Sequence, residues 1–248
     1  YLLRTVPENG LVVSPLNDEV ATRVIKKACW STSQTHSDLA ADWHYEKTSP
    51  DGRTFDLKRV GETVASINWS LMGDHNIENA LSAMIVAHQL GAPLDQISQA
   101  LTQFKGIKRR MQLQGTVRGI KVYDDFAHHP TAIKKTLLSL RAHVKKDRII
   151  AIVEFGSNTM KSAVHQLSAL QSALQPADQV FLMQPDHSEL PLIKTIQALK
   201  DEKTLVFNTI EGIIDKVLEY AKARDNVLVM SNTGFQHIHH HLLDALSK

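Results

Sequence analysis

Apolar stretches alternate with amphipathic ones through the second half of the chain, and this alternation most constrains the fold. From residue 147 onward the stretches RIIAIVEF, QVFLMQ, TLVFN and NVLVMS are each followed by a segment with apolar residues at helical spacing. Such βαβ units are typical of a mostly parallel, doubly wound sheet. We therefore predict an α/β domain, Rossmann-like in architecture, that opens with a hairpin of MQLQGTV and GIKVYDD turned at Arg118-Gly119.

The chain before residue 107 follows a different pattern. GLVVSP predicts a short strand, and a helix opened by Asn17 or Asp18 follows it. Between residues 42 and 72, turn signals at the PDG tripeptide and at Gly61 separate β-rich segments. This spacing indicates an antiparallel meander.

Two helices are predicted next. In GDHNIENALSAMIVAHQLG the apolar residues line one face, and Gly91 can end the helix. Pro93 begins another helix, with Ile97, Leu101 and Phe104 as its apolar stripe. The basic KGIKRR segment then breaks the pattern, so we expect two domains, residues 1–107 and 108–248.

Composition narrows the class of protein. A formal net charge of +2 with 22% charged residues does not suggest a nucleic-acid-binding surface. No apolar run reaches the ~18 to 20 residues that span a bilayer, and the first residues lack a signal-peptide pattern. The single cysteine, Cys29, excludes an internal disulfide framework. We therefore expect a soluble cytoplasmic protein that has no nucleic-acid or membrane partner.

Polar residues follow the predicted strands of the second half. In parallel sheets ligands bind beyond the carboxyl ends of the strands, where helix N-termini and loops meet. For any one of these residues, helix capping or a turn is an equally good explanation. Together they predict a polar rim, made of Asp124, Asp125, Ser157, Asn158, Gln184, Ser231 and Asn232.

The densest group of titratable residues is in VYDDFAHHPTAI, residues 122–133. One aspartate could satisfy backbone donors after the strand, and Pro130 could begin a helix. That explanation leaves His128 and His129 unaccounted for. Imidazoles at a helix N-terminus can stabilise anionic groups or exchange protons near neutral pH, so we predict that both face a ligand.

The same stretch resembles a known family. DDFAHHPTAI, with GDHNIENALSA and FKGIKRRM upstream and SNTMK and VLVMSNTGF downstream, is similar to the Mur ligases, ATP-dependent enzymes of peptidoglycan synthesis and recycling. The combination is most similar to the branch that recycles murein peptides. The resemblance covers nearly the whole chain. It implies that residues 1–107 are the C-terminal part of a central ATP-binding domain and that residues 108–248 are the C-terminal domain.

The resemblance also implies a nucleotide site. By the family pattern His75, Asn76 and Asn79 hold adenine, Arg110 contacts the nucleotide and Asp125 binds ribose. Residues 75 and 79 are four apart, and residues 76 and 79 three apart, so both pairs share one face of a helix. The alternatives are helix capping for the first group and a solvated linker charge for Arg110.

The implied reaction is formation of an amide bond. ATP, with Mg²⁺, would phosphorylate the carboxylate of UDP-N-acetylmuramate, and the amine of a murein tripeptide, L-alanyl-γ-D-glutamyl-meso-diaminopimelate, would attack the acyl phosphate. His128 and His129 would face the reaction centre as catalytic residues. The peptide carboxylates would be held by Ser157, Asn158, Thr159 and Lys161.

Two departures from the family pattern are visible. The recycling branch usually reads EPRSNTMK, whereas this chain has Phe155-Gly156 in place of Pro-Arg. No G-x-x-x-x-G-K-[ST] phosphate-binding loop occurs anywhere in the sequence. We expect that loop, the magnesium ligands and a UDP-binding domain to lie upstream, and we expect this chain alone to be inactive.

Three alternatives remain open. The branch that adds L-alanine to UDP-N-acetylmuramate shares the DDF/YxHHP motif, and the chain could instead be a nucleotide or peptide binder without catalysis. A metallohydrolase is the third, because His237 and His241 in FQHIHHHLLDALSK are spaced like zinc ligands on a helix. A histidine-rich helix end is more often a solvated feature, so we predict no metal site.

Overall fold

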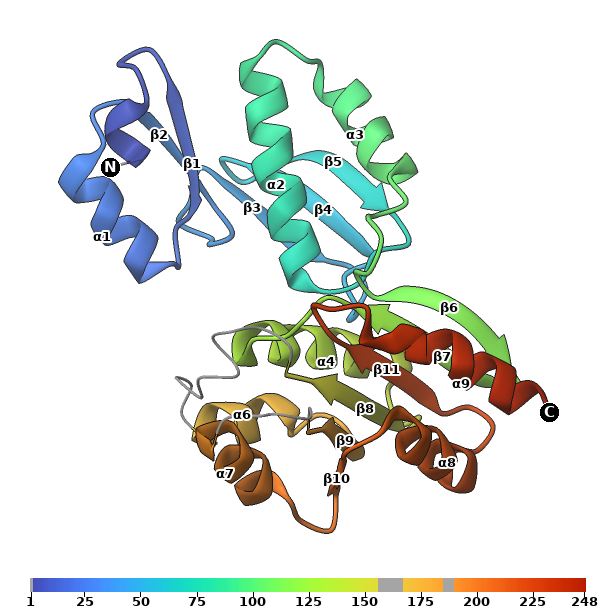
Figure 1. Cartoon of the computed structure of the whole chain (residues 1–248). Helices are drawn as coiled ribbons and strands as arrows, with labels where there is room; N and C mark the ends of the chain where they lie inside the picture. Colours follow the sequence, from blue (N-terminus) through green and yellow to red (C-terminus); the bar gives the residue numbers. More distant parts are fainter. Residues whose placement is uncertain (1, 156–166, 185–189) are drawn as a thin grey trace. The chain divides into compact units, whose positions relative to one another are not determined.

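The protein consists of two compact units, residues 1–106 and residues 107–248. The computed structural model describes residues 2–155, 167–184 and 190–248, and Figure 1 shows the helices and strands of both units. Each unit has its own sheet and its own hydrophobic core, so we describe each by itself.

Unit 1 contains a mixed five-stranded sheet in the order β1-β2-β3-β4-β5. Its strands are β1 (Leu11–Pro15), β2 (Thr32–His36), β3 (Trp43–Lys47), β4 (Thr54–Arg59) and β5 (Glu62–Asn68). β3, β4 and β5 are antiparallel, which confirms the predicted meander, whereas β1, β2 and β3 are parallel neighbours. The sequence analysis did not find β2, because TSQTH has no apolar alternation.

The helices of unit 1 largely follow their apolar patterns. A short 3₁₀ helix, η1 (Leu2–Thr5), precedes β1, and α1 (Glu19–Ala28) begins after Asp18, whose carboxylate accepts a hydrogen bond from the amide of Ala21. α2 (Asp74–Gln89) buries the expected face. α3 (Leu94–Gln103) buries only Ile97, and Phe104 lies beyond its end with 45% of its surface exposed, so the predicted stripe is wrong at that residue.

Unit 2 contains a six-stranded sheet in the order β10-β9-β8-β11-β7-β6. Its strands are β6 (Gln112–Val117), β7 (Ile120–Asp125), β8 (Ile149–Glu154), β9 (Gln179–Met183), β10 (Thr204–Phe207) and β11 (Asn226–Met230). All neighbours are parallel except the β6–β7 hairpin. The predicted hairpin and the predicted mainly parallel sheet are both confirmed.

Helices cover both faces of this sheet. The helices are α4 (Pro130–Val144), α6 (Leu167–Leu174), α7 (Leu190–Leu199), α8 (Ile210–Tyr220) and α9 (Ile238–Ser247), with a short 3₁₀ turn, η2 (Phe235–His237), before the last. Ile120, Val122 and Val227 form one core with α8 and α9. Side chains alternate between the faces of a strand, so the intervening buried residues face the opposite side, where α4 packs against α6.

None of the helices in the described ranges is both long enough and apolar enough to cross a membrane.

Candidate active site

The carboxyl ends of three parallel strands meet at one edge of the unit 2 sheet. The register pairs Val229 with Asp124 and Met230 with both Asp125 and Val153, so β7, β11 and β8 end side by side. Asp124 and Asp125 are the last two residues of β7, rather than residues that follow it as predicted. Successive residues in a strand point to opposite faces, so the two carboxylates have different surroundings.

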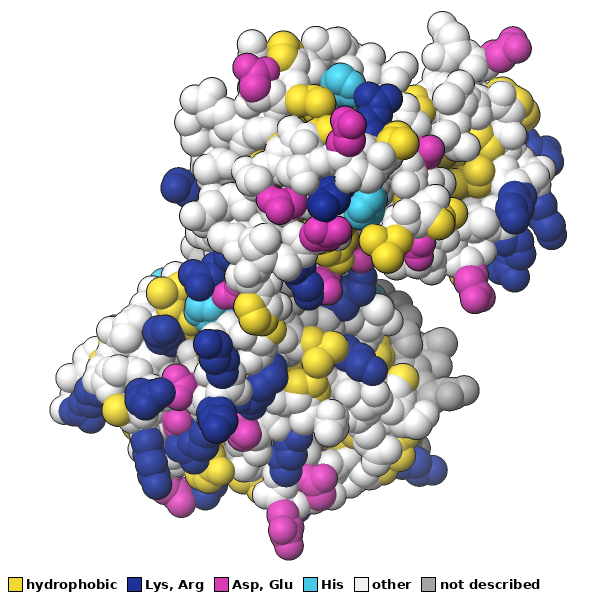
Figure 2. Space-filling model, turned by 180° about the vertical axis from the view of Figure 1, so that it is seen from behind, with side chains coloured by type: hydrophobic (Ala, Val, Ile, Leu, Met, Phe, Trp, Pro, Cys, Tyr) yellow, Lys and Arg dark blue, Asp and Glu magenta, His cyan; other side chains and the backbone are white. Residues whose placement is uncertain are grey.

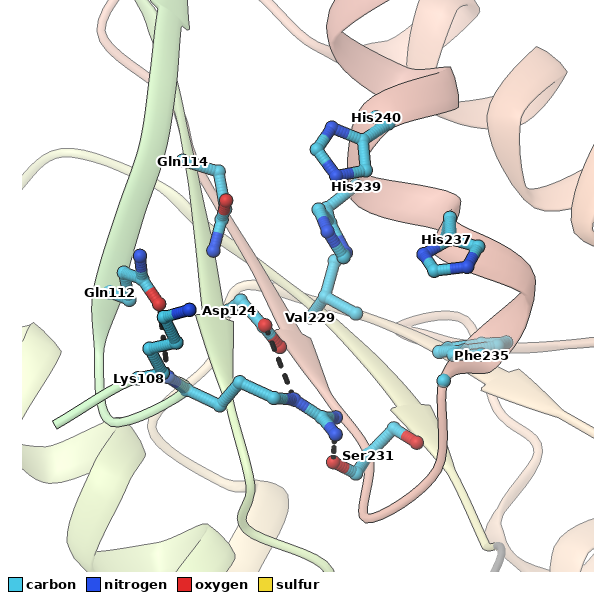
Figure 3. Close-up of a pocket in the computed structure, with 12 residues that line it drawn as sticks. Lys108, Gln112, Gln114, Asp124, Val229, Ser231, Phe235, His237, His239 and His240 are labelled. Atoms are coloured by element: carbon cyan, nitrogen blue, oxygen red, sulfur yellow. Dashed lines mark hydrogen bonds and ion pairs between the residues drawn. The ribbon is translucent and has the colours of Figure 1, made fainter.

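Asp124 lies in a pocket with a volume of about 480 Å³ (Figure 3). Its buried carboxylate forms an ion pair with Arg109, with 3.3 Å between Oδ2 and Nε. The same guanidinium donates a hydrogen bond of 2.6 Å from Nη2 to the carbonyl oxygen of Ser231. Arg109 is therefore held by two neighbouring strand ends, and it places a cation at the mouth of the pocket.

Amides and imidazoles line the walls of this pocket. Figure 3 shows Gln112 and Gln114 on one side and His237, His239 and His240 on the other. The rings of His239 and His240 lie 4.3 Å apart. Burial lowers the pKa of His239, neighbouring positive groups lower it further, and Asp124 acts in the opposite direction. A neutral His239 can accept a hydrogen bond from a ligand.

The structure does not place His237 and His241 on the same helix, as the zinc-like spacing would require. α9 begins at Ile238, and His237 precedes it with a φ of 56° in the left-handed region. Phe235, Gln236 and His237 all have positive φ, so the chain turns sharply before α9. Within residues 2–155, 167–184 and 190–248, no three His, Cys, Asp or Glu side chains are arranged to hold a metal ion.

Hydrogen bonds connect the loop after β11 to the end of β8. Glu154 accepts hydrogen bonds from the hydroxyls of Ser231 and Thr233. Those hydroxyls in turn accept backbone N–H groups of Thr233 and Phe235 at 2.9 and 3.0 Å. The side-chain oxygen of Asn232 is buried and has no hydrogen-bond partner among the described residues.

Asp125 faces the interior instead of the pocket. Its carboxylate accepts hydrogen bonds from the amides of Met111 and Ala127, both at 2.8 Å, and from the hydroxyl of Thr136 at 3.2 Å. Burial raises the pKa of Asp125, although these hydrogen bonds and the charge of Arg110 act in the opposite direction. The carboxylate thereby fixes the turn before β6 and the loop before α4. A ribose contact by Asp125 stays a prediction, and a hydroxyl would have to share oxygens that are already hydrogen-bonded.

The two histidines predicted to be catalytic lie where α4 begins. Pro130 is the first residue of the helix and His129 is its N-cap. Nδ1 of His128 lies 2.9 Å from the carbonyl oxygen of Phe126. Since a carbonyl can only accept, Nδ1 carries a proton, and in the neutral ring the lone pair is on Nε2. The His128 and His129 rings are 4.2 Å apart, both half-buried, and Phe126 lies edge-on to His128.

Arg110 lies beside the same loop. It is exposed, and its guanidinium carbon is 5.8 Å from the centre of the Phe126 ring. Arg109 and Met111 on either side have positive φ, so the peptide turns sharply at this point, and the guanidinium carbon of Arg109 also lies 5.4 Å from the centre of the Phe126 ring. Thus unit 2 brings Arg110 and His128 to Phe126, with His129 beside His128.

His75, Asn76 and Asn79 lie in the first turns of α2, in unit 1. Asn79 is exposed, and the side-chain amide of Asn76 donates a 2.7 Å hydrogen bond to the carbonyl oxygen of Met72. The helix confirms that the three share neighbouring positions on one surface. Because each unit is described by itself, their predicted meeting with Arg110 and Asp125 in one cleft stays a prediction.

The residues predicted to hold the peptide, Ser157, Asn158, Thr159 and Lys161, lie outside the described residues. Phe155, which replaces the proline of the family pattern, is fully buried at the end of β8.

Arg109 was not predicted as a site residue, and the sequence pattern alone did not distinguish the roles of Asp124 and Asp125. The signal that could have found them is the strand period of two. If one aspartate of a pair faces the core of a sheet, its neighbour faces the other side. What this edge can do chemically follows from its groups: it can bind polar or anionic ligands through Arg109, Arg110 and the pocket amides, and exchange a proton at His128.

Both units are of the α/β class, each with helices packed on its own sheet. Residues 1–87 match the Mur ligase middle domain, and residues 109–233 match the Mur ligase glutamate ligase domain. The chain belongs to the Mur ligase family.

Individual relatives agree with this assignment. The chain is 37% identical, over 99% of its length, to the UDP-N-acetylmuramate–L-alanyl-γ-D-glutamyl-meso-2,6-diaminoheptandioate ligase of Haemophilus influenzae. It is 34% identical to the crystal structure of a murein peptide ligase from Psychrobacter arcticus, with a TM-score of 0.73 over the whole chain and 53% of that structure. A ligase from Thermotoga maritima, solved in complex with ADP, shares the fold with a TM-score of 0.76 at 15% identity, over 99% of this chain and 56% of that one. The chain spans about half the length of the curated relatives it matches, 54% in the Haemophilus case.

Proposed function

We propose that this chain is the nucleotide- and peptide-binding part of an ATP-dependent ligase that joins a murein tripeptide to UDP-N-acetylmuramate. One observation carries the proposal: 37% identity to the Haemophilus ligase extends over 99% of the chain and includes both domain types. The motifs in VYDDFAHHPTAI and GDHNIENALSA support the same branch.

The proposed reaction has two steps. A carboxylate oxygen of UDP-N-acetylmuramate attacks the γ-phosphorus of ATP and ADP leaves, which produces an acyl phosphate. The free amine of the tripeptide attacks the acyl carbon, phosphate leaves and the nitrogen loses a proton, so an amide bond forms. Mg²⁺ would neutralise charge on the phosphates when bound.

Each unit contains residues that are proposed to contact the nucleotide. The exposed amide of Asn79 and the side chains of His75 and Asn76 suit the adenine edge, which carries both donors and acceptors. Arg110 has an exposed guanidinium that can bind phosphate or ribose oxygens bidentately. We propose that Asp125 acts on the nucleotide mainly by holding Met111, and with it the orientation of Arg110.

The peptide would be bound at the carboxyl edge of unit 2. His128 can accept the proton that the attacking amine loses, because its Nε2 has a free lone pair. The pocket around Arg109 and Asp124 lies at the same edge and offers a cation and amides to a carboxylate-rich peptide. Ser157, Asn158, Thr159 and Lys161 would complete the carboxylate contacts. Within this proposal the Phe155-Gly156 departure raises the KM for the peptide, since a guanidinium is missing.

The test is a ligase assay on a chimera in which the part of the Haemophilus relative that this chain does not cover precedes the chain. We expect sustained ADP release only when UDP-N-acetylmuramate and an amine are both present, and a higher kcat/KM with the tripeptide than with L-alanine. Equal kcat/KM for both amines would instead favour the alanine-adding branch. Steady-state ADP release at the same rate with and without an amine, and no amide product, would contradict ligation altogether.

A further inference from the structure

A second pocket in unit 2 has no part in the proposed ligase reaction. It has a volume of about 610 Å³. Three loops form it: the turn and first residues of the β7 hairpin, the α4–β8 loop and the α8–β11 loop. Its lining residues are Gly119, Lys121, His143, Val144, Lys145, Lys146, Asp147, Arg224 and Asn226.

This pocket lies at the amino edge of the sheet. Asn226 of β11 pairs with Lys121 of β7 on one side and with Ile149 of β8 on the other. These are the first pairs of the three parallel strands. The pocket of Arg109 and Asp124 lies at their other ends, so the two pockets are separated by the length of the strands.

Hydrogen bonds fix the backbone of the α4–β8 loop, which carries Lys145 and Lys146. Nη1 of Arg141 donates hydrogen bonds to the carbonyl oxygens of Lys145 and Asp147, at 2.9 and 2.8 Å. Lys145 adopts a positive φ of 57° at the end of α4, and a hydrogen bond of 2.9 Å from the amide of Arg224 to the carbonyl of Gly119 joins the other two loops. The cations are therefore presented from fixed backbone positions.

Positive charge in this pocket is poorly neutralised. Four cationic side chains, Lys121, Lys145, Lys146 and Arg224, line it with one carboxylate, Asp147. Arg224 pairs with Asp147 at 2.8 Å, but its side chain is 80% exposed. In the part of the chain that the structure describes, no carboxylate oxygen lies within 4 Å of the ammonium groups of the three lysines. Lys and Arg side chains also gather on the face of unit 2 that Figure 2 shows.

We propose that this pocket binds a compact multivalent phosphate, such as a diphosphate or triphosphate group. Several converging cations around a hollow of this size suit a small anion with more than one charge. The lining contains no Phe, Tyr or Trp side chain, and Val144 is its only large apolar residue, so apart from the His143 imidazole a nucleobase would find no ring to stack on. A free phosphate and the phosphate headgroup of a lipid share this chemistry, and the experiment separates them.

The test is titration of the 248-residue chain with inorganic tripolyphosphate by calorimetry at about 150 mM salt, where weak surface attraction is screened. Amide chemical shifts measured in parallel locate the ligand. We expect one site, with shifts at Gly119, Lys121 and Lys145. Lys145→Gln together with Lys146→Gln should raise the Kd about ten-fold or more, because charge-assisted hydrogen bonds are lost.

The matched control is Lys26→Gln with Lys27→Gln, a second pair of adjacent exposed lysines, located in α1 of unit 1. This control should leave the Kd unchanged. The proposal would be overturned if both double variants lost the same affinity for tripolyphosphate, or if the chemical-shift changes were confined to the residues around Arg110. Absence of tripolyphosphate binding at this salt concentration would also overturn it. Binding to vesicles of an anionic phospholipid or to poly-glutamate, without binding of tripolyphosphate, would also overturn it and would identify a macromolecular partner.

Discussion

The two edges of the unit 2 sheet both carry many charges but use them differently. At the carboxyl edge the carboxylates of Asp124 and Asp125 are buried, and each is bound by groups of the protein itself. At the amino edge Lys145 and Lys146 are exposed and extend from a loop that is held by hydrogen bonds from Arg141 to its backbone and by the ion pair of Asp147 with Arg224. Arg148 forms an ion pair with the buried carboxylate of Asp225 at the same edge.

The comparison shows which charged side chains are held in one geometry by the protein and which remain available to bind a ligand. Buried charges must be paired, so they hold a loop in one conformation, and removal of one partner is strongly destabilising. Exposed charges contribute little to stability because water screens them, but they remain free for a ligand. We therefore expect substitutions at the carboxyl edge to lower both stability and activity. Substitutions at the amino edge should weaken anion binding alone.

The largest stability difference should come from two arginines, one at each edge. Arg109→Ala leaves the carboxylate of Asp124 buried without its partner, and we expect the free energy of unfolding to fall by about 3 kcal/mol. Arg224→Ala removes an exposed pair and should cost about 0.5 kcal/mol. Urea denaturation of both variants measures this. Equal losses would contradict the contrast between the edges.

A smaller loss is expected when Asp125 keeps its shape but loses its charge. Asp125→Asn places an amide where the carboxylate accepts hydrogen bonds from Met111, Ala127 and Thr136, so one donor loses its acceptor. We expect a loss of about 2 kcal/mol in the free energy of unfolding. Asp147→Asn at the amino edge is the matched control, and its loss should stay below about 0.5 kcal/mol.

The stability difference between the parent protein and Asp125→Asn should depend on pH. Burial raises the pKa of Asp125 in the folded state, so the folded protein binds this proton more tightly than the unfolded chain does. The associated stability is fully present below the unfolded pKa of ~4 and is lost as the pH rises through the folded pKa. The unfolding free energy of the parent, relative to Asp125→Asn, should therefore increase as the pH is lowered toward 4. A difference that shrinks on acidification would show that Asp125 is stabilised in its charged form.

The smallest stability effect is expected for the predicted adenine contact in unit 1. Asn79 is exposed, so Asn79→Ala should change the unfolding free energy by less than about 0.5 kcal/mol. In the chimera it should raise the Kd for a fluorescent ATP analogue about five-fold, which corresponds to one lost hydrogen bond. Gln89→Ala, an exposed amide at the other end of α2, should leave the Kd unchanged.

Much of the fold could be predicted from the sequence, because in most helices and strands the spacing of the apolar residues matches the face that is buried. The stripe of α2 and the apolar strands of unit 2 are continuous enough to identify their elements. β2 could not be predicted in this way, because its TSQTH sequence is polar and forms a strand through parallel pairing with β1. Phe104 fitted the helical period, yet α3 ends before it.

The candidate site was predictable in position but not in geometry. The sequence indicated that polar residues gather at the strand ends, and the roles of His75, Arg110 and His128 came from the family resemblance. Which of Asp124 and Asp125 faces the pocket depends on strand register, and the partner Arg109 depends on a turn with positive φ. Three consecutive left-handed residues before α9 are likewise set by the packing around them and not by residue type.

The central claim is that the carboxyl edge of unit 2 carries the ligase chemistry through His128. The most direct measurement is kcat of the chimera carrying His128→Asn, whose amide can still donate to the carbonyl of Phe126 but lacks the basic Nε2. We predict a fall in kcat of about 100-fold, within the range for loss of a general base, with the Kd for the ATP analogue unchanged. An unchanged kcat in His128→Asn, together with a reduced kcat in His128→Ala, would show that the residue only positions the loop and would contradict the claim.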